Sequence, residues 1–178
     1  MPDMQKTYKE TIVPQLIEKR KYSNVMKVPK LSKILISTGI GTGKEKDAFT
    51  EAKKHLTLIA GQAPVITKTR KNISNFKLRA GMPVGAMVTL RNRKMYDFLD
   101  RLVHTALPQV RDFRGIKQNG FDGRGNYNMG LNDISVFPEI DLDKIKHQMG
   151  INITFVTTAE TDDEARDLLT MLEMPFAK

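Results

Sequence analysis

Residues 84–90 read Val-Gly-Ala-Met-Val-Thr-Leu, and this stretch decides the fold class that we predict. Alternation along it defines two faces, and the apolar face holds Val84, Ala86, Val88 and Leu90. The opposite face holds Gly85, Met87, Thr89 and Arg91. Because successive side chains of a strand point to opposite faces, we expect a strand with one face in the core. Thr89 and Arg91 would then meet solvent or a ligand.

On both sides of this strand, periodicity predicts further elements. We expect helices over residues 7–20, 45–60 and 95–106, a last helix from a capping box at 161–164 to Pro175, and strands over 33–38, 64–69, 134–137 and 151–158. Thr7 and Glu10 match a capping box, and Pro14 predicts a kink or an early end of the first helix. Strands and helices mix without strict alternation, which favours an α+β fold over a doubly wound parallel sheet.

The 178-residue chain is long enough for one compact domain with a sizeable core. We expect a single domain over residues 1–178, with a helical arm at 1–28 and an α+β core at 29–178. The absence of cysteine excludes disulfides, thiolate catalysis and cysteine-bound zinc. No apolar run approaches the roughly 20 residues that span a bilayer. No signal segment follows the N-terminus, so we expect a cytoplasmic protein without a membrane partner.

Positive charge is concentrated between residues 52 and 96, which hold ten basic and no acidic side chains. The whole chain has 29 basic and 20 acidic residues, so the rest of it holds 19 basic and 20 acidic ones. A charge run is often only a solvated face, but solubilising surfaces usually mix both signs. One quarter of the chain carries all the excess charge, which indicates a polyanionic partner such as RNA.

Within this span, residues 68–82 have the composition of a long basic loop, Lys-Thr-Arg-Lys-Asn-Ile-Ser-Asn-Phe-Lys-Leu-Arg-Ala-Gly-Met. Their only bulky apolar side chains are Ile73, Phe76, Leu78 and Met82. By contrast, residues 131–178 carry ten acidic and four basic side chains. The protein therefore has a basic and an acidic part, which suits a position between RNA and a basic protein.

Residues 109–130 form a second segment without periodicity, rich in Gly and Arg. Segments of this length are usually functional. In Asp122-Gly-Arg-Gly-Asn126, glycine allows close approach of the backbone to a phosphate or base, and arginine offers a planar fork of donors. Phe121 and Tyr127 would stack on a base. In the alternative, the loop is ordered by pairing of Asp112 and Asp122 with arginines, namely Arg111, Arg114 or Arg124.

Signals for catalysis are weak. Gly39–Lys44 lies between a predicted strand and a predicted helix, where phosphate-binding loops occur, but both ends of the Walker pattern fail. The three histidines, His55, His104 and His147, have no metal-ligand spacing. We therefore expect no catalytic residue, cofactor or metal, and keep a nucleotide-dependent enzyme that uses Gly39–Lys44 only as an alternative.

Several blocks, in this order, resemble those of one known family. They are Lys68-Thr-Arg-Lys71, Val84-Gly85 with Val88-Thr-Leu-Arg91, Val110-Arg-Asp-Phe-Arg-Gly115, Phe121-Asp-Gly-Arg-Gly-Asn-Tyr127 and Phe137-Pro-Glu-Ile140. Over essentially all 178 residues the chain resembles bacterial large-subunit ribosomal protein number five, the 5S-rRNA-binding family of the central protuberance.

This resemblance implies a single α+β domain whose mainly antiparallel sheet packs on helices, with no enzyme activity. It implies a structural role in the large ribosomal subunit, where the chain binds 5S rRNA and contacts 23S rRNA and transfer RNA in the peptidyl site. It also implies a bridge to small-subunit protein thirteen and contacts to other central-protuberance proteins. The charge pattern alone would equally fit an RNA- or tRNA-binding factor outside the ribosome.

The resemblance also implies site residues. For 5S rRNA we expect Ser37, Gln62, Thr67, Lys68, Thr89 and Arg91. Ser37 stands where the family usually has Asn, and its hydroxyl reaches less far than an amide. For tRNA we expect the loop tip, roughly Asn72 to Met82, and its neighbours, with contacts from Arg70, Lys71, Asn72, Ser74, Asn75, Lys77 and Arg79. Other rRNA contacts or loop structure would come from Arg111, Arg114, Arg124, Asn126 and Tyr127, and the subunit bridge from Glu139, Asp141 and Asp143.

Overall fold

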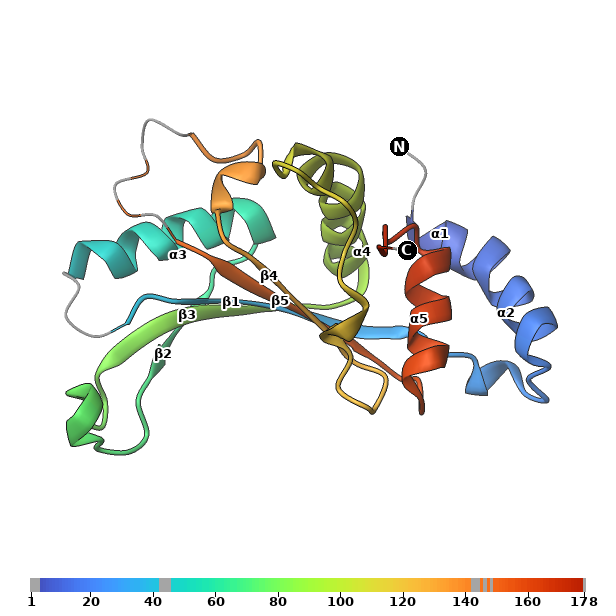
Figure 1. Ribbon diagram of the computed structural model, residues 1–178, viewed down its shortest axis with the longest axis horizontal. Helices are drawn as coiled ribbons and strands as arrows, with labels where there is room; N and C mark the ends of the chain where they lie inside the picture. The colour runs from blue at the N-terminus through green and yellow to red at the C-terminus, as the bar shows by residue number, and fades with distance from the viewer. Residues whose placement is uncertain (1–3, 42–45, 142–144, 146, 148, 178) are drawn as a thin grey trace. The chain divides into compact units, whose positions relative to one another are not determined.

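The computed structural model describes residues 4–41, 46–141, 145, 147 and 149–177. Within them, five strands form one antiparallel sheet of order β2-β3-β1-β5-β4: β1 (Leu31–Gly39), β2 (Val65–Lys68), β3 (Pro83–Leu90), β4 (Tyr127–Leu131) and β5 (Ile151–Thr157). The α-helices are α1 (Met4–Thr7), α2 (Val13–Arg20), α3 (Lys46–Ala60), α4 (Asn92–Arg101) and α5 (Asp162–Met171) (Figure 1). The predicted α+β fold with a mainly antiparallel sheet is confirmed.

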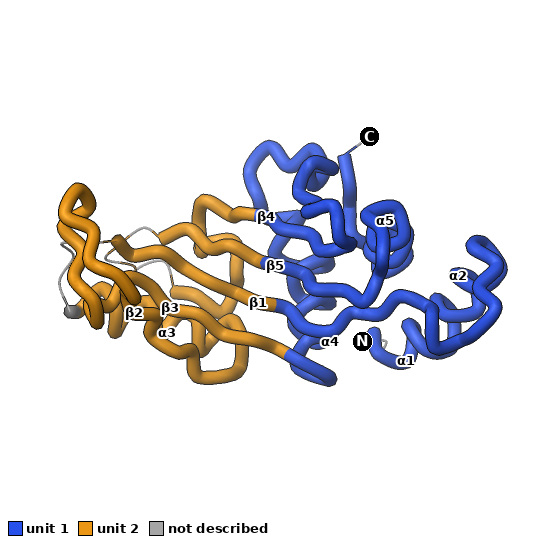
Figure 2. The backbone as a smooth tube through the Cα atoms, turned by 90° about the horizontal axis from the view of Figure 1, so that it is seen from below, with its two compact units in different colours: residues 1–34, 91–129, 154–178 blue, residues 35–90, 130–153 orange. Residues whose placement is uncertain are grey.

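The chain divides into two compact units (Figure 2). Unit 1 contains Met1–Ile34, Arg91–Met129 and Thr154–Lys178, and unit 2 contains Leu35–Leu90 and Gly130–Ile153. Strands β1, β4 and β5 each contribute residues to both units. The expected division into an arm at 1–28 and a core at 29–178 stays a prediction.

Unit 2 is built on the β2–β3 hairpin and on α3, which packs against both strands (Figure 1). Helix α3 buries Ala52, Leu56 and Ile59, which recur at helical spacing and are at most 1 % exposed. Gly61, with a φ of +61°, ends this helix in the left-handed conformation that glycine adopts without strain. Because α3 covers one face of the hairpin strands, their other face stays open.

Unit 1 begins with a helical stretch from Met4 to Arg20 that contains a π turn at Tyr8–Ile12. The predicted capping box is wrong, because Thr7 is already helical (φ −54°, ψ −43°) and its side chain makes no capping hydrogen bond. The helix also does not end at Pro14. Proline removes one backbone donor and crowds the preceding turn, and the wider π turn directly before α2 accommodates it.

Two predictions in the C-terminal half are corrected by the structure. Residues 134–137, predicted as a strand, contain a 3-10 helix at Ile134–Val136, and the side chain of its N-cap, Asp133, accepts the Ser135 N–H at 3.0 Å. The segment 109–130, predicted as a loop, ends in strand β4. Its sequence, Tyr-Asn-Met-Gly-Leu, contains Asn and Gly, which are depleted in strands.

Candidate nucleic-acid interface

The open face of the unit 2 sheet carries three of the polar side chains predicted for 5S rRNA. Ser37 lies between two buried residues of β1, and Thr89 lies between two buried residues of β3. Since side chains alternate along a strand, both hydroxyls point away from the buried face. Thr67 pairs across the hairpin with Gly85, which lies on the same face of β3 as Thr89. The sheet therefore gathers Ser37, Thr67 and Thr89 on one surface.

These side chains keep hydrogen-bonding capacity for a ligand. Ser37 and Thr67 have no side-chain hydrogen bond within the part of the chain that the structure describes. The Gln62 Nε2 donates to the Thr89 carbonyl at 3.4 Å, which is long for a hydrogen bond. A Cβ atom at Gly85 would collide with the backbone carbonyl of β1 and lie 3.2 Å from the Thr67 hydroxyl. Glycine at that position thus permits the close approach of β3 to β1.

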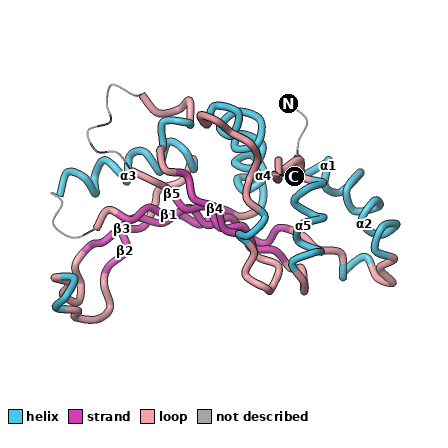
Figure 3. The backbone as a smooth tube through the Cα atoms, viewed as in Figure 1, coloured by secondary structure: helices cyan, strands magenta, loops and turns pink. Residues whose placement is uncertain are grey.

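The connection between β2 and β3, residues 68–82, is an ordered structure that we call the basic hairpin. Thr69 donates its N–H to the Met82 carbonyl at 2.9 Å, and Ile73 and Leu78 exchange two backbone hydrogen bonds of 3.0 Å. A 3-10 turn at Ser74–Phe76 closes the end (Figure 3). The predicted basic loop therefore continues the strand pair, and its hydrogen-bonded backbone sets the positions from which the charged side chains extend.

The side chains of the basic hairpin face outward. Residues 71–77 are all exposed, and the Phe76 side chain at the tip is 66 % exposed. Asn72 differs from its neighbours because its Oδ1 accepts the Ala80 N–H at 2.7 Å, so it helps to shape the hairpin. Within the described residues, five hairpin cations have no carboxylate partner: Lys68, Arg70, Lys71, Lys77 and Arg79.

Two aspartates order the Gly/Arg-rich loop in unit 1. The Asp122 carboxylate accepts the Asn126 Nδ2 at 2.7 Å and the Arg124 N–H at 2.9 Å, and these hydrogen bonds, the first above all, lower the pKa of Asp122. Asp162, at the start of α5, accepts two further backbone N–H groups, those of Gly123 at 3.0 Å and Gly125 at 2.8 Å. The loop is ordered, but the predicted pairing of Asp112 and Asp122 with arginines is wrong for the described residues: Asp122 and Asp162 bind backbone and amide groups, and neither Asp112 nor Asp122 pairs with a guanidinium group.

Tyr127 belongs to the interior of unit 1, and Asn126 beside it is half-buried. Tyr127 is 1 % exposed, and its hydroxyl donates to the Lys117 carbonyl at 2.6 Å. Burial raises the pKa of Tyr127 to about 12. The Asn126 Oδ1 accepts the Thr157 N–H at 3.3 Å. Both side chains therefore have structural partners, whereas the side chains of three loop residues are exposed and without a partner among the described residues: Arg111, Arg114 and Arg124.

The acidic residues expected at the subunit bridge are only partly described. Glu139 is half-buried and Asp141 is exposed, and Asp143 lies outside the described residues. The Gly39–Lys44 segment is described only as far as Gly41.

One polar residue of the open face in unit 2 is missing from the predicted set. Asn152 lies in β5 between two buried isoleucines, so its side chain is on the open side of the strand. The Thr38 hydroxyl donates to the Gly150 carbonyl at 2.7 Å. This contact places Asn152 near Ser37 along the two neighbouring strands. A Cβ atom at Gly130 would lie 3.3 Å from the Asn152 Oδ1, so glycine leaves room for the amide. The alternation of the isoleucines with Asn152 is the sequence signal for this position.

Two family models match the chain, one on each side of the start of β3. The model described as ribosomal protein L5 matches residues 24–79, and the model for the C-terminus of the same ribosomal family matches residues 83–176. The chain belongs to the ribosomal protein L5 family. It is 52 % identical over 178 residues to large ribosomal subunit protein uL5 of Clostridium tetani, covering 99 % of both chains. It is 55 % identical over 177 residues to the uL5 protein of Burkholderia multivorans, again covering 99 % of both.

Membership of the L5 family makes the chain a structural constituent of the large ribosomal subunit, located in the ribosome, with rRNA and ribosomal components as partners. It is a structural protein and not an enzyme, so the nucleotide-dependent alternative is wrong. No helix in the described part of the chain is long and apolar enough to cross a membrane.

Proposed function

We propose that this L5-family chain binds 5S rRNA with the open sheet face of unit 2 and helps to attach it to the large subunit in the central protuberance. In the same proposal, the tip of the basic hairpin contacts transfer RNA in the peptidyl site. The observation that carries the proposal is the presence, within unit 2, of a face of hydroxyl and amide groups and a hairpin whose cations have no partner among the described residues.

The open sheet face and the basic hairpin of unit 2 make different contributions to RNA binding. Hydroxyl and amide groups on the open face match ribose 2′-hydroxyls and base edges in the shallow groove of an RNA helix, and they set orientation. Hairpin cations, beginning with Lys68, neutralise phosphates and supply affinity. Arg91, which directly follows β3 and is the first residue of its segment of unit 1, offers a planar donor fork. Ser37 has a shorter side chain than the Asn that is usual in the family at this position. The Asn152 side chain, on the neighbouring strand β5, is longer and offers an amide group to the RNA.

The salt dependence of 5S rRNA binding tests this proposal. If about five cations neutralise phosphates, the logarithm of the affinity falls with the logarithm of the salt concentration with a slope of about −3.5 to −4.5. Replacement of Lys68, Lys71 and Lys77 by alanine should make the slope shallower by about two to three. Removal of three exposed lysines from unit 1, Lys6, Lys9 and Lys117, is the matched control and should leave it unchanged. A wild-type slope near zero refutes the proposal.

The tRNA contact is tested in assembled ribosomes. The substitutions Phe76→Ala and Arg79→Ala remove a base-stacking surface and a phosphate partner from the hairpin tip. We expect peptidyl-site tRNA to dissociate faster from these ribosomes, while 5S rRNA content stays normal. Unchanged dissociation from both variants would remove tRNA from the proposal and leave the 5S rRNA part intact.

The remaining contacts have charge complementarity as their support. Arg111, Arg114 and Arg124 present exposed guanidinium groups, which suit 23S rRNA phosphates. Glu139 and Asp141, with Asp143, would face basic small-subunit protein thirteen. Charge reversal of Asp141 to lysine should slow the joining of the two subunits, and an unchanged joining rate would contradict this bridge.

A further inference from the structure

The most exposed of the large apolar side chains that the structure describes is Met26, at 89 %, and its neighbour Val25 is 65 % exposed. Both lie far from the basic hairpin in sequence, in a 3-10 turn of unit 1 at Val25–Lys27. Apolar side chains held in solvent next to charged groups mark interaction sites more often than isolated exposed residues do. This turn is therefore a candidate contact surface outside the proposed 5S rRNA and tRNA sites.

Hydrogen bonds hold the backbone of the turn in this exposed position. The Asn24 Oδ1 accepts the Met26 N–H at 2.9 Å, and the Val28 N–H donates to the Val25 carbonyl at 3.2 Å. Downstream, Lys30 and Thr158 exchange two hydrogen bonds of 3.0 Å, one through the threonine hydroxyl. These hydrogen bonds fix the backbone of the turn, so binding a partner needs no reordering of the backbone at Met26.

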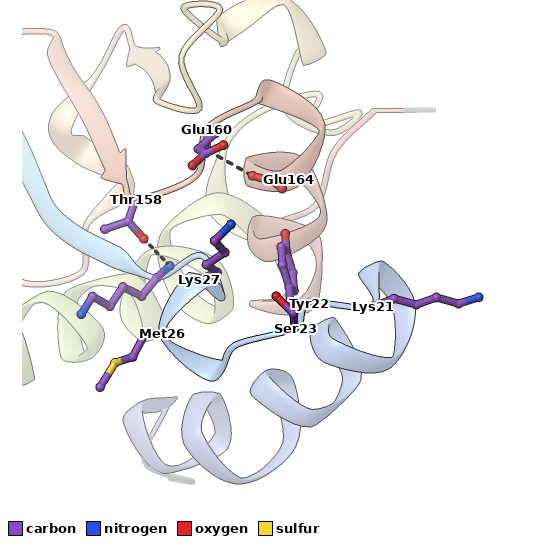
Figure 4. Close-up of a pocket in the computed structure, with 9 residues that line it drawn as sticks. Lys21, Tyr22, Ser23, Met26, Lys27, Thr158, Glu160 and Glu164 are labelled. Atoms are coloured by element: carbon purple, nitrogen blue, oxygen red, sulfur yellow. Dashed lines mark hydrogen bonds between the residues drawn. The ribbon is translucent and has the colours of Figure 1, made fainter.

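Beside Met26 is a pocket of about 450 Å³ whose lining includes three lysines, Lys21, Lys27 and Lys30. Figure 4 shows the Lys27 side chain extending toward α5 and Lys21 pointing away at the rim. All three are exposed and have no carboxylate partner within the described residues. By contrast, Lys19 and Arg20 just before them both bind Asp167, at 2.8 Å and 2.7 Å.

The acidic side of the pocket is partly engaged by the protein itself. Glu164 accepts the Glu160 N–H at 3.1 Å. The Tyr22 ring points toward Glu164 (Figure 4), and burial, followed by the neighbouring Glu164 carboxylate, raises the pKa of Tyr22 to about 12. Glu164 therefore serves as a structural acceptor at the start of α5. The residues that line the pocket therefore include three lysines and one exposed carboxylate, that of Glu160.

We propose that this pocket and its rim form a second RNA-binding site, in which Lys27 and Lys30, with Lys21 at the rim, hold backbone phosphates and Met26 packs on the face of an unpaired base. A nucleotide presents a phosphate and a flat, polarisable ring together, and a methionine thioether packs well against such a ring. In a constituent of the large subunit the abundant polyanion is rRNA, which favours RNA over an acidic protein segment. The inference rests on the proposed function only in taking RNA as the ligand.

Photo-crosslinking within assembled large subunits tests the site. A benzophenone amino acid replaces Met26 in the full-length chain, and the same replacement at the exposed Lys9 is the control. We expect the Met26 position, and not the Lys9 position, to crosslink to defined rRNA nucleotides. Crosslinks to a ribosomal protein alone, or none at all, would overturn the proposal.

A binding measurement on free components gives independent evidence. The triple variant Lys21→Ala, Lys27→Ala, Lys30→Ala is compared with Lys6→Ala, Lys9→Ala, Lys117→Ala for binding to purified 23S rRNA and to purified 5S rRNA. For at least one of these RNAs, the log–log salt slope should become shallower by about two to three in the pocket variant only. Met26→Ala should lower the affinity for the same RNA by about two- to tenfold.

Equal slopes for both triple variants on both RNAs would refute a phosphate site in this pocket. The hairpin variants of unit 2 separate this outcome from failure of the proposed function. If they weaken 5S rRNA binding while the pocket variants change nothing, the proposed function stands and this inference fails.

Discussion

The substitution Tyr127→Phe separates a core role of Tyr127 from the RNA-stacking role that its sequence context suggests. It removes one oxygen atom and keeps the ring, whose centroid lies 4.8 Å from that of Phe121 and 5.4 Å from that of Phe176. The apolar contacts of unit 1 are therefore preserved. The lost group is a hydroxyl that donates to the Lys117 carbonyl at 2.6 Å.

The expected cost follows from this single hydrogen bond. With the pKa raised by burial to about 12, the hydroxyl is a neutral donor throughout the physiological range. Removing it leaves the carbonyl without that donor inside the protein, which costs about 1–3 kcal/mol of unfolding free energy. For a chain of this size that corresponds to a decrease of about 2–12 °C in the melting temperature.

Thermal or urea unfolding measures the loss, and a 5S rRNA titration well below the melting temperature measures affinity. Tyr96→Phe is the matched control, because Tyr96 is 6 % exposed and its hydroxyl has no hydrogen-bond partner among the described residues, so its loss should be nearly neutral. We expect Tyr127→Phe to destabilise the protein and leave RNA affinity within about twofold. Unchanged stability together with weaker RNA binding would refute the structural role.

Two further predictions concern the contacts that hold unit 1 together. Asp162→Ala should free the Gly/Arg-rich loop, cost about 1–3 kcal/mol and speed tryptic cleavage after Arg124; an unchanged cleavage rate would contradict the ordering role. Burial acts to lower the pKa of His104, but hydrogen bonds with Asp100 and Glu173 outweigh it and raise this pKa above its ordinary value of 6.5. The stability that His104 contributes is therefore fully present below pH 6.5 and lost as the pH rises through the raised pKa. Urea unfolding from about pH 6 to about pH 9 should show this loss in the wild type and a flatter profile in His104→Gln, and identical profiles would refute it.

Strands with clean alternation were predictable because burial on one face imposes a period of two on the sequence. Three of the strands, β1, β3 and β5, lie close to their expected ranges for this reason. Strand β4 contains Asn and Gly, so its sequence cannot be distinguished from that of a loop. The apolar run at 134–137 is too short to distinguish a strand from a helical turn, and Asp133 decides in favour of the turn by capping it.

In the candidate site, too, some features were predictable from sequence and others depended on the fold. The concentration of cations in residues 52–96 is a property of composition, and it indicated RNA before any fold was known. By contrast, the sequence offered Tyr127 and Asn126 as RNA contacts, whereas the fold gives both of them partners inside unit 1. Asn152 shows the reverse case, because only the sheet order places it beside the strand that carries Ser37.

The sequence by itself determined the α+β class, the basic character of residues 68–82, and the family. These properties are local, because periodicity, charge clusters and contiguous motifs can each be recognised within a short stretch of sequence. Only the tertiary structure decided which polar groups are already engaged and which stay available. Asp162 is hydrogen-bonded to a loop nearly 40 residues away along the chain, with Gly123 and Gly125 as donors, and Met26 is left in solvent beside lysines that lack a carboxylate partner in the described residues. The physical reason is that hydrogen-bond satisfaction and burial depend on which distant segments the fold brings together.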